Sequence, residues 1–255
     1  MKEKNKIYFA SDLHLGSDCF EDPIITEKRF VGWLDYIKED AQSLYLLGDI
    51  FDFWFEYKHV VSKGFSRFLG KIAEMTDAGI EVHFFIGNHD IWMYDYLPKE
   101  IGVIIHREAL IVEICGKKCY LAHGDGMGDN SKKLHLMRKI FHNSWCRKMF
   151  ASIHPRWGMG FGQAWSLHNR KKGTKVPVPY LGEDKEHLVC YAKQYLQQDP
   201  SIDFFVFGHR HIPLDLMLSK KSRVIILGDW LQLFSYALMD EHGLRLLDYH
   251  PTTKA

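Results

Sequence analysis

Short apolar runs alternate with helix-like patterns in the first third of the chain, and this alternation restricts the fold more than any other feature. The apolar runs at residues 6–11, 43–49 and 80–88 are predicted to be buried strands. Residues 25–39 and 65–79, which lie between them, carry apolar side chains at helical spacing. Because strands that alternate with helices form βαβ units, we expect a largely parallel sheet in this part of the chain.

The predicted strands become denser further along the chain. Residues 109–125 are predicted to form a hairpin that turns at Gly116. Hardly any helical pattern separates the next apolar runs, which predict four more strands at residues 202–211, 222–229, 234–240 and 243–249. We therefore expect an α/β fold in which a two-layered core of mixed sheets is flanked by helices.

Residues 128–185 break this pattern and are predicted to be a helical insertion into a core formed by residues 1–127 and 186–255. Apolar residues recur near a 3.6-residue period at the start of the insertion: Leu134, Met137, Phe141, Trp145, Met149 and Ile153. The glycines of RWGMGFG indicate that residues 156–165 do not simply continue that helix. The insertion is also basic. Its apolar face either packs against the core or, together with the basic residues, covers a ligand with an acyl part and a phosphate part.

Composition narrows the class of protein. A length of 255 residues suits one domain with an insertion, and a net charge of +1 lacks the basic excess of a nucleic-acid binder. The five cysteines are scattered without a CxxC pair, so we expect no disulfide framework and a reducing cytoplasm. We also expect no signal peptide and no membrane span, because the chain start and the whole sequence lack sufficiently long apolar runs.

Polar groups follow five of the predicted strands at the point where each strand ends. The motifs are DLH, GD, GNHD, HGD and GHRH at residues 12–14, 48–49, 87–90, 123–125 and 208–211. In open α/β sheets, sites form at the carboxyl ends of strands. The motifs supply seven candidate metal ligands: Asp12, His14, Asp49, Asn88, His123, His209 and His211. Such donors suit first-row divalent ions, and seven are about right for two ions that share a carboxylate and bind a phosphoryl group.

The ordered blocks DLH, GDIFD, GNHD, HGD and GHRH resemble the motifs of the calcineurin-like binuclear metallophosphoesterases, from Asp12 to about Asp229. The resemblance implies a four-layer αββα sandwich, here with a helical lid. It also implies one ion on Asp12, His14, Asp49 and His211, and a second on Asp49, Asn88, His123 and His209. Manganese is the usual ion in bacterial members, while the residues themselves would equally permit iron or zinc.

His89 follows the predicted ligand Asn88 and is expected to act on the substrate rather than on an ion. The resemblance implies that its imidazole reaches the phosphate or the leaving oxygen, as electrostatic stabiliser or general acid. Asp90 either orients that imidazole or caps the turn before residues 91–97, and both roles stay open. Asp125 is expected to lie outside the ligand set.

The start SDLHLG, a tryptophan shortly after the Gly-Asp block and a helical segment after His-Gly-Asp resemble the UDP-2,3-diacylglucosamine hydrolases of lipid A synthesis. That family cleaves the pyrophosphate of its substrate into UMP and 2,3-diacylglucosamine 1-phosphate (lipid X), with the acyl chains held between lid and core. The resemblance implies a set of substrate-binding residues: Trp54, Asn88, His89, Ser166, Asn169, Arg170 and Lys172.

One motif departs from that family, because this chain has Gly-Asn-His-Asp where the best-known members have Gly-Asn-Arg-Asp. A metallophosphoesterase acting on another nucleotide or phosphodiester therefore stays open as the alternative. A non-catalytic scaffold is disfavoured, since all seven ligands and His89 are present. With the leading interpretation we expect an acylated UDP-sugar as substrate, a cytoplasmic enzyme peripherally associated with the anionic surface of the inner membrane, and no required protein partner.

Overall fold

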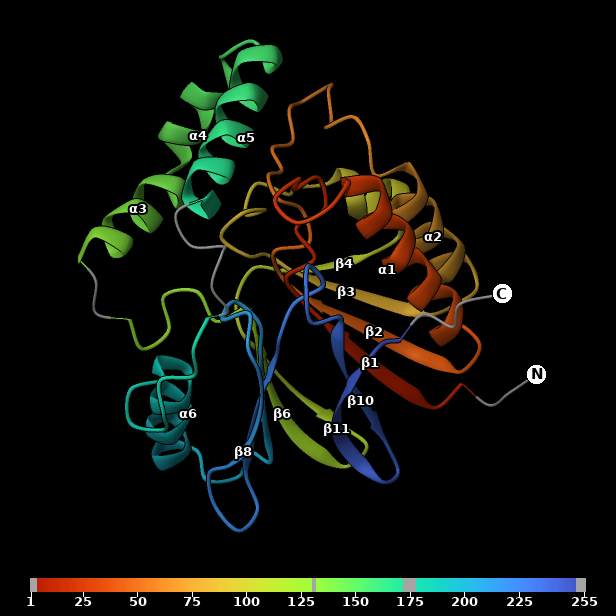
Figure 1. The fold of residues 1–255 in the computed structure, drawn as a ribbon, viewed down its shortest axis with the longest axis vertical. Coiled ribbons are helices and arrows are strands. Elements are labelled where there is room, and N and C mark those ends of the chain that lie inside the picture. The colour runs from red at the N-terminus through yellow and green to blue at the C-terminus, as the bar shows by residue number, and fades with distance from the viewer. Residues whose placement is uncertain (1–3, 130–131, 172–177, 251–255) are drawn as a thin grey trace.

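The computed structural model describes residues 4–129, 132–171 and 178–250, and the side chains of residues 132–135 and 167–171 lie outside this description. Two β-sheets lie face to face in its core, with helices on their outer faces (Figure 1). Three further helices stand together beyond one end of the sheets (Figure 1). No helix in the described ranges is long and apolar enough to cross a membrane.

The first sheet contains the predicted βαβ units. Its strand order is β11-β10-β1-β2-β3-β4, and β1 to β4 are parallel to one another. The strands are β1 Lys6–Ala10, β2 Ala41–Leu47, β3 Glu81–Phe85, β4 Ile104–His106, β10 Ser235–Asp240 and β11 Gly243–Asp248. The outer face is covered by α1 (Pro23–Ile37) and α2 (Ser66–Asp77), which bury Phe30, Trp33 and Phe68 completely.

The second sheet contains the predicted hairpin and has the order β5-β6-β7-β9-β8. Its strands are β5 Leu110–Ile114, β6 Lys117–Ala122, β7 Phe204–Phe207, β8 Pro213–Met217 and β9 Arg223–Leu227. Cys115 and Gly116 form the two-residue hairpin turn with φ angles of 49° and 69°. The helix α6 (His187–Gln198) covers the outer face through Leu188 and Val189.

Alternation along the strands separates the layers. Phe9 and Leu47 of the first sheet pack against Leu121 of the second in one buried cluster between the sheets. Their chain neighbours Tyr8 and Leu46 point the other way and belong to the cluster beneath α1 and α2. The predicted α/β fold with mixed sheets in an αββα arrangement is therefore confirmed.

Residues 132–171 form α3 (Lys132–His142), α4 (Ser144–Ala151) and α5 (Pro155–Lys171), which we call the helical segment. The single helix suggested by the apolar period is wrong, because the chain breaks at Asn143. The side-chain oxygen of Asn143 accepts the N–H groups of Trp145 and Cys146 at 2.8 and 3.2 Å, which caps a new helix. The division into an insertion of residues 128–185 and a two-part core remains a prediction.

The glycine-rich stretch of α5 is helical because two of its glycines pack against a neighbouring loop. A Cβ atom on Gly158 would lie 2.2 Å from the Oη of Tyr57, and one on Gly162 would lie 2.2 Å from Cζ of Phe53. Gly160, between them in sequence, would have no atom within 4 Å of its Cβ. Close packing of α5 on the loop therefore outweighs the low helix propensity of glycine.

Four elements are absent from the sequence prediction: β4, β8, α6 and the π-helix Leu97–Ile101. The strands β4 and β8 lie at sheet edges, and alternate residues of β8 are exposed. Short edge strands with one exposed face lack the continuous apolar run that marks a buried strand.

Candidate metal centre and adjoining pocket

Five of the seven predicted ligands have a left-handed backbone at the carboxyl ends of their strands. Their φ angles are 55° for Asp12, 45° for His14, 53° for Asp49, 68° for His209 and 51° for His211. This conformation is unfavourable for residues other than glycine and occurs preferentially at functional sites. The tight turns after β1, β2 and β7 thus bring side chains from both sheets to one edge of the sandwich.

The first group of ligands contains Asp12, His14 and His211. Oδ1 of Asp12 lies 3.4 Å from Nε2 of His211 and 3.7 Å from Nε2 of His14. The two Nε2 atoms are 3.3 Å apart, and the two imidazole rings are stacked. Three donor atoms of the kind that bind a divalent ion therefore converge within 4.8 Å of one another.

The second group contains Asp49, His123 and His209, whose donor atoms also lie within 4.8 Å of one another. Oδ2 of Asp49 is 3.4 Å from Nε2 of His123 and 3.7 Å from Nε2 of His14, so this carboxylate stands between the two groups. Oδ1 of Asn88 lies 3.4 Å from Nε2 of His123. All seven predicted ligands are thus brought together, with Asp49 in the place predicted for a shared ligand.

Glycines in the motifs make this convergence possible. A Cβ atom on Gly87 would lie 2.2 Å from Oδ1 of Asp49, and one on Gly208 would lie 2.7 Å from Oδ2 of Asp12. Real Cβ atoms do not approach so closely, so a larger residue at either position would displace a carboxylate. The Gly-Asn-His-Asp and Gly-His-Arg-His motifs therefore need glycine for packing against ligands from other strands.

The charges of the cluster fit bound cations. Asp12 is fully buried, and no hydrogen bond in the described part of the chain reaches its Oδ1. Burial raises the pKa of the Asp12 carboxyl above its ordinary value, which indicates a charge that lacks full compensation. Burial would also raise the pKa of Asp49, but the surrounding imidazoles, led by His123, hold it well below the ordinary value. Burial and His123 lower the pKa of His209, which favours the neutral imidazole that binds metal.

Outer contacts orient two of the histidines. Nδ1 of His123 donates to the carbonyl of Leu47 at 2.7 Å, which directs Nε2 toward Asp49 and Asn88. Nδ1 of His211 lies 3.2 Å from Oδ2 of Asp229, whose other oxygen accepts three backbone N–H groups. Asp229 was not among the predicted site residues, although its Gly-Asp pair follows a strand as Asp49 does.

The predicted catalytic pair is separated in the structure. His89 lies beside the cluster, with its ring edge-on to His14 at 4.9 Å, and its Nδ1 is 2.8 Å from the carbonyl oxygen of Asp52. Asp90 instead accepts the backbone N–H groups of Gly87 and Ile50, each at 2.7 Å. Its role as the group that orients His89 is therefore wrong, and the alternative of a turn-stabilising carboxylate agrees with these contacts. Burial, and then the charge of Asp49, raise the pKa of Asp90 to about 7.

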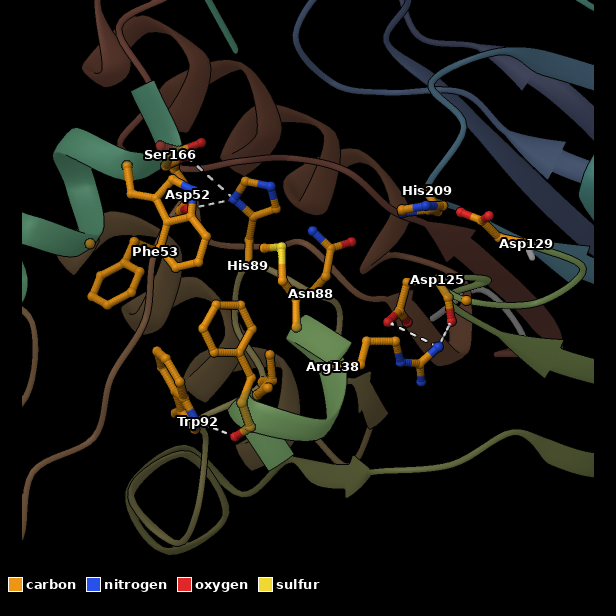
Figure 2. Close-up of a pocket in the computed structure, with 16 residues that line it drawn as sticks. Asp52, Phe53, Asn88, His89, Trp92, Asp125, Asp129, Arg138, Ser166 and His209 are labelled. Atoms are coloured by element: carbon orange, nitrogen blue, oxygen red, sulfur yellow. Dashed lines mark hydrogen bonds and ion pairs between the residues drawn. The ribbon is translucent and has the colours of Figure 1, made fainter. Parts of the chain in front are cut away.

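The cluster opens into a cavity of about 320 Å³ between the core and the helical segment (Figure 2). Asn88, His89 and His209 form the side nearest the predicted ligands. Arg138 of α3 lies near them, where it donates to the carbonyl of Asp125 and keeps Nη1 3.5 Å from Oδ2 of that residue. Arg138 was not predicted as a site residue, because the basic pattern of α3 does not reveal which cation faces the cavity.

The opposite side of the cavity is apolar and aromatic, as the left part of Figure 2 shows. A second cavity of about 120 Å³ continues from it and is lined almost entirely by apolar side chains. The two cavities share five lining residues: Phe53, Trp92, Phe141, Gly162 and Trp165. Phe53 and Trp92 belong to the core, and their place in the cavity was not predicted, since an apolar residue after a strand gives no sign of the direction it faces.

The remaining predicted substrate-binding residues lie in different parts of the structure. Ser166 lies in the cavity wall with Oγ 3.3 Å from Nδ1 of His89, as Figure 2 shows. Trp54 is fully buried in the core, stacked on Phe51 at 4.4 Å, so its prediction as a substrate contact is wrong. The side chains of Asn169 and Arg170, and the whole of Lys172, lie outside the described residues.

A family comparison accounts for the fold and the motifs together. Residues 5–213 match the family described as calcineurin-like phosphoesterase. The chain belongs to this family. This calcineurin-like phosphoesterase is a metal-dependent phosphoester hydrolase, and its two groups of converging donor atoms support two divalent metals.

Curated relatives resemble this phosphoesterase over nearly their whole length. A UDP-2,3-diacylglucosamine hydrolase from Porphyromonas gingivalis is 44% identical over 93% of this chain and 95% of its own. Another from Photorhabdus laumondii is 24% identical over 87% of this chain and 90% of its own. Among solved structures, a dimetal phosphatase from Danio rerio is 14% identical over 98% of this chain and 100% of its own, with a TM-score of 0.45. The first relative confirms the predicted resemblance to the hydrolase family.

Proposed function

We propose that this phosphoesterase hydrolyses the pyrophosphate of UDP-2,3-diacylglucosamine to UMP and 2,3-diacylglucosamine 1-phosphate. The observation that carries the proposal is the cavity, which joins the metal cluster to an aromatic, apolar wall. A ligand that fills it needs a phosphate group at one end and an apolar group at the other. The Porphyromonas gingivalis relative, which carries the name of this activity, supports the same substrate.

Seven residues of the proposed enzyme hold the two ions. Asp12, His14, Asp49 and His211 bind one, and Asp49, Asn88, His123 and His209 bind the other. We propose Mn²⁺ as the ion because it is the usual ion of the bacterial metallophosphoesterases that the motifs resemble, while the nitrogen and oxygen donors equally permit iron or zinc. When bound, the two ions would supply Lewis-acid activation of the phosphoryl group and of the attacking water.

His89 is the proposed catalytic residue of the chain. Its Nδ1 is 2.8 Å from the carbonyl oxygen of Asp52, so a proton held there leaves Nε2 to face the substrate phosphate. Protonated at Nε2, the ring donates a hydrogen bond to the phosphate or a proton to the leaving oxygen. Asp90 supports this geometry indirectly, since it ties the backbone of Gly87 to that of Ile50.

The helical segment acts as the lid in this proposal. The acyl chains lie along Phe53, Trp92 and Phe141 and extend into the second cavity. Arg138 and Ser166, at the polar side, contact the phosphate-bearing part of the substrate. Asn169, Arg170 and Lys172 stay proposed contacts to the same part.

A lipid substrate also implies a membrane surface. Trp145 and Trp157 are 67% and 72% exposed, and the exposed cations Lys148 and Arg156 lie on the same two helices. Exposed aromatic and cationic side chains on one helical unit suit the interface of an anionic membrane. We therefore place the enzyme in the cytoplasm, peripherally bound to the inner membrane.

The proposal is tested by incubating the enzyme with UDP-2,3-diacylglucosamine and Mn²⁺ in water enriched in ¹⁸O and following the reaction by phosphorus NMR. We expect release of UMP that carries the label, because water attacks the α-phosphorus. Absence of turnover, together with rapid hydrolysis of a soluble nucleotide or small diester, would favour the alternative of another phosphodiester substrate. This alternative stays open because the chain has Gly-Asn-His-Asp where the best-known members of the hydrolase family have Gly-Asn-Arg-Asp.

A further inference from the structure

The loop after β7 has an unusual backbone. The N–H group of Arg210 donates to the carbonyl of Gly208 at 2.8 Å, which closes a three-residue turn around His209. The φ angle of His209 is 68°, and that of His211 is 51°. A three-residue turn with positive φ at its centre is rare and strained. Two predicted metal ligands, one from each group, thus depend on a backbone that surrounding contacts must hold in place.

The side chain of Arg210 forms such a contact with Glu186. Its Nε donates to Oε1 of Glu186, and its Nη2 donates to Oε2 at 2.9 Å. Glu186 is completely buried, and the side chain of Arg210 is only 15% exposed. A two-point contact between a guanidinium and a carboxylate fixes the orientation of both planes, which a single hydrogen bond does not.

Glu186 is itself anchored where the chain enters α6. Its N–H donates to the carbonyl of Gly182, and its own carbonyl accepts the N–H of Cys190, both at 2.9 Å. The next residue, His187, lies with its ring 6.3 Å from that of His209. The carboxylate therefore projects from a held backbone toward the metal-binding loop.

We propose that the Glu186–Arg210 pair is a positioning pair that holds His209 and His211 in the orientation needed for the two ions. A buried ion pair is weak evidence for added stability, because desolvation offsets much of the attraction. Its value here is geometric: Arg210 stands between the two histidines, so fixing its side chain fixes the loop that carries both. The proposal depends on the metal cluster and is independent of which phosphoester is the substrate.

The test compares metal binding in three variants, Glu186→Ala, Glu186→Gln and Arg210→Lys, each a full-length chain. Metal-free protein is titrated with Mn²⁺, and free Mn²⁺ is measured by its electron paramagnetic resonance signal. We expect the dissociation constant of at least one site to rise about 10- to 100-fold in each variant, the usual effect of removing a group that orients a metal ligand. In activity assays, kcat at a fixed low Mn²⁺ concentration falls and recovers in part when Mn²⁺ is raised, while KM changes little.

The matched control is Asp215→Ala, which removes the carboxylate of another two-point arginine pair, Arg223 with Asp215, between β9 and β8. We expect this control to bind Mn²⁺ as the unaltered protein does. Circular dichroism and thermal unfolding of the metal-free proteins separate folding from metal affinity. If Glu186→Ala does not fold, Glu186→Gln and Arg210→Lys decide the question. Folded variants with unchanged Mn²⁺ affinity and stoichiometry would overturn the proposal and leave the pair a purely structural contact.

Discussion

The metal cluster and the helical segment are built in opposite ways. In the cluster, Asp12, His14 and Asp49 are at most 2% exposed and follow two neighbouring strands of the core, β1 and β2. In the helical segment, the largest apolar side chains include Trp145 and Trp157, which are mostly exposed. Burial and the contacts that hold a strained backbone fix the first region, whereas the second rests on a few glycine and aromatic contacts. A buried chemical centre beside a helical wall whose outer aromatic side chains are exposed suits an enzyme that performs a general reaction on a particular substrate.

The largest effect is expected where the two ligand groups meet, at Asp49. Replacing it in Asp49→Ala removes the carboxylate shared by both groups, and we expect kcat/KM to fall at least about 1,000-fold, since a bound ion supplies several kcal/mol to the transition state. Activity is measured on both UDP-2,3-diacylglucosamine and a small diester, and both should fall equally. Near-normal turnover by a folded Asp49→Ala protein would contradict the shared-ligand assignment.

The next largest effect is expected from substitutions in the aromatic wall of the cavity. Here Trp92, which lines the cavity, is compared with Trp54, which is buried in the core. Trp92→Ala removes a ring that packs against Phe53 and Phe141 in the cavity, so we expect KM for the acylated substrate to rise about 10- to 100-fold. KM for a small diester should stay within about 3-fold. Trp54→Phe is the control, because Trp54 is buried in the core: the melting temperature should fall while KM is unchanged. A raised KM in Trp54→Phe together with an unchanged KM in Trp92→Ala would indicate that Trp54, and not Trp92, contacts the substrate.

Substitutions at two glycines of α5 test whether contact with Phe53 positions the helical segment on the core. Gly162→Ala places a methyl group against the ring of Phe53, and overpacking of this kind costs about 1–3 kcal/mol. We expect KM for the acylated substrate to rise about 5- to 10-fold as α5 shifts. Gly160→Ala meets no atom within 4 Å and should raise helix stability slightly, without an effect on KM. Equal effects of the two substitutions would indicate that helix propensity, rather than contact with Phe53, governs the segment.

The smallest effect is expected at the outer surface of the helical segment. Trp157→Ser should weaken binding to vesicles of phosphatidylethanolamine and phosphatidylglycerol about 3- to 10-fold, because one interfacial aromatic ring is lost. Flotation of vesicles with bound protein measures this. Tyr36→Ser, which alters a 61% exposed aromatic residue on α1, is the matched control and should bind as before. Equal binding by both variants would contradict the proposed membrane-facing surface.

The same contrast between the two regions explains what the sequence could predict. Asp12, Asn88 and His209 were found because a ligand directly after a buried strand has only one edge of the sheet to occupy. Trp54 was misassigned, and one of the two roles left open for Asp90 was wrong, since their neighbours in sequence are site residues while their contacts are the aromatic core and the backbone of residues 50–51. Adjacency in sequence does not reveal which way a side chain turns.

The helical segment was harder to predict for a different reason. Its apolar period continues through Asn143, and only the cap formed by that side chain shows that the helix ends there. From sequence alone, Gly158 and Gly162 indicate a break in the helix. Their close contacts with Tyr57 and Phe53 explain why the segment is helical. Both features depend on residues distant in sequence or on local hydrogen bonds, which periodicity does not report.

The division between a reactive core and a selective helical segment is tested most directly by replacing residues 130–175 with a short glycine–serine linker. The ratio of kcat/KM for UDP-2,3-diacylglucosamine to kcat/KM for a small diester is measured before and after the replacement, with Mn²⁺ binding as the check on the metal cluster. We expect the ratio to fall at least about 100-fold, through KM for the acylated substrate, because about 2.7 kcal/mol of apolar contact is lost. Equal losses on both substrates, with metal binding intact, would contradict the division.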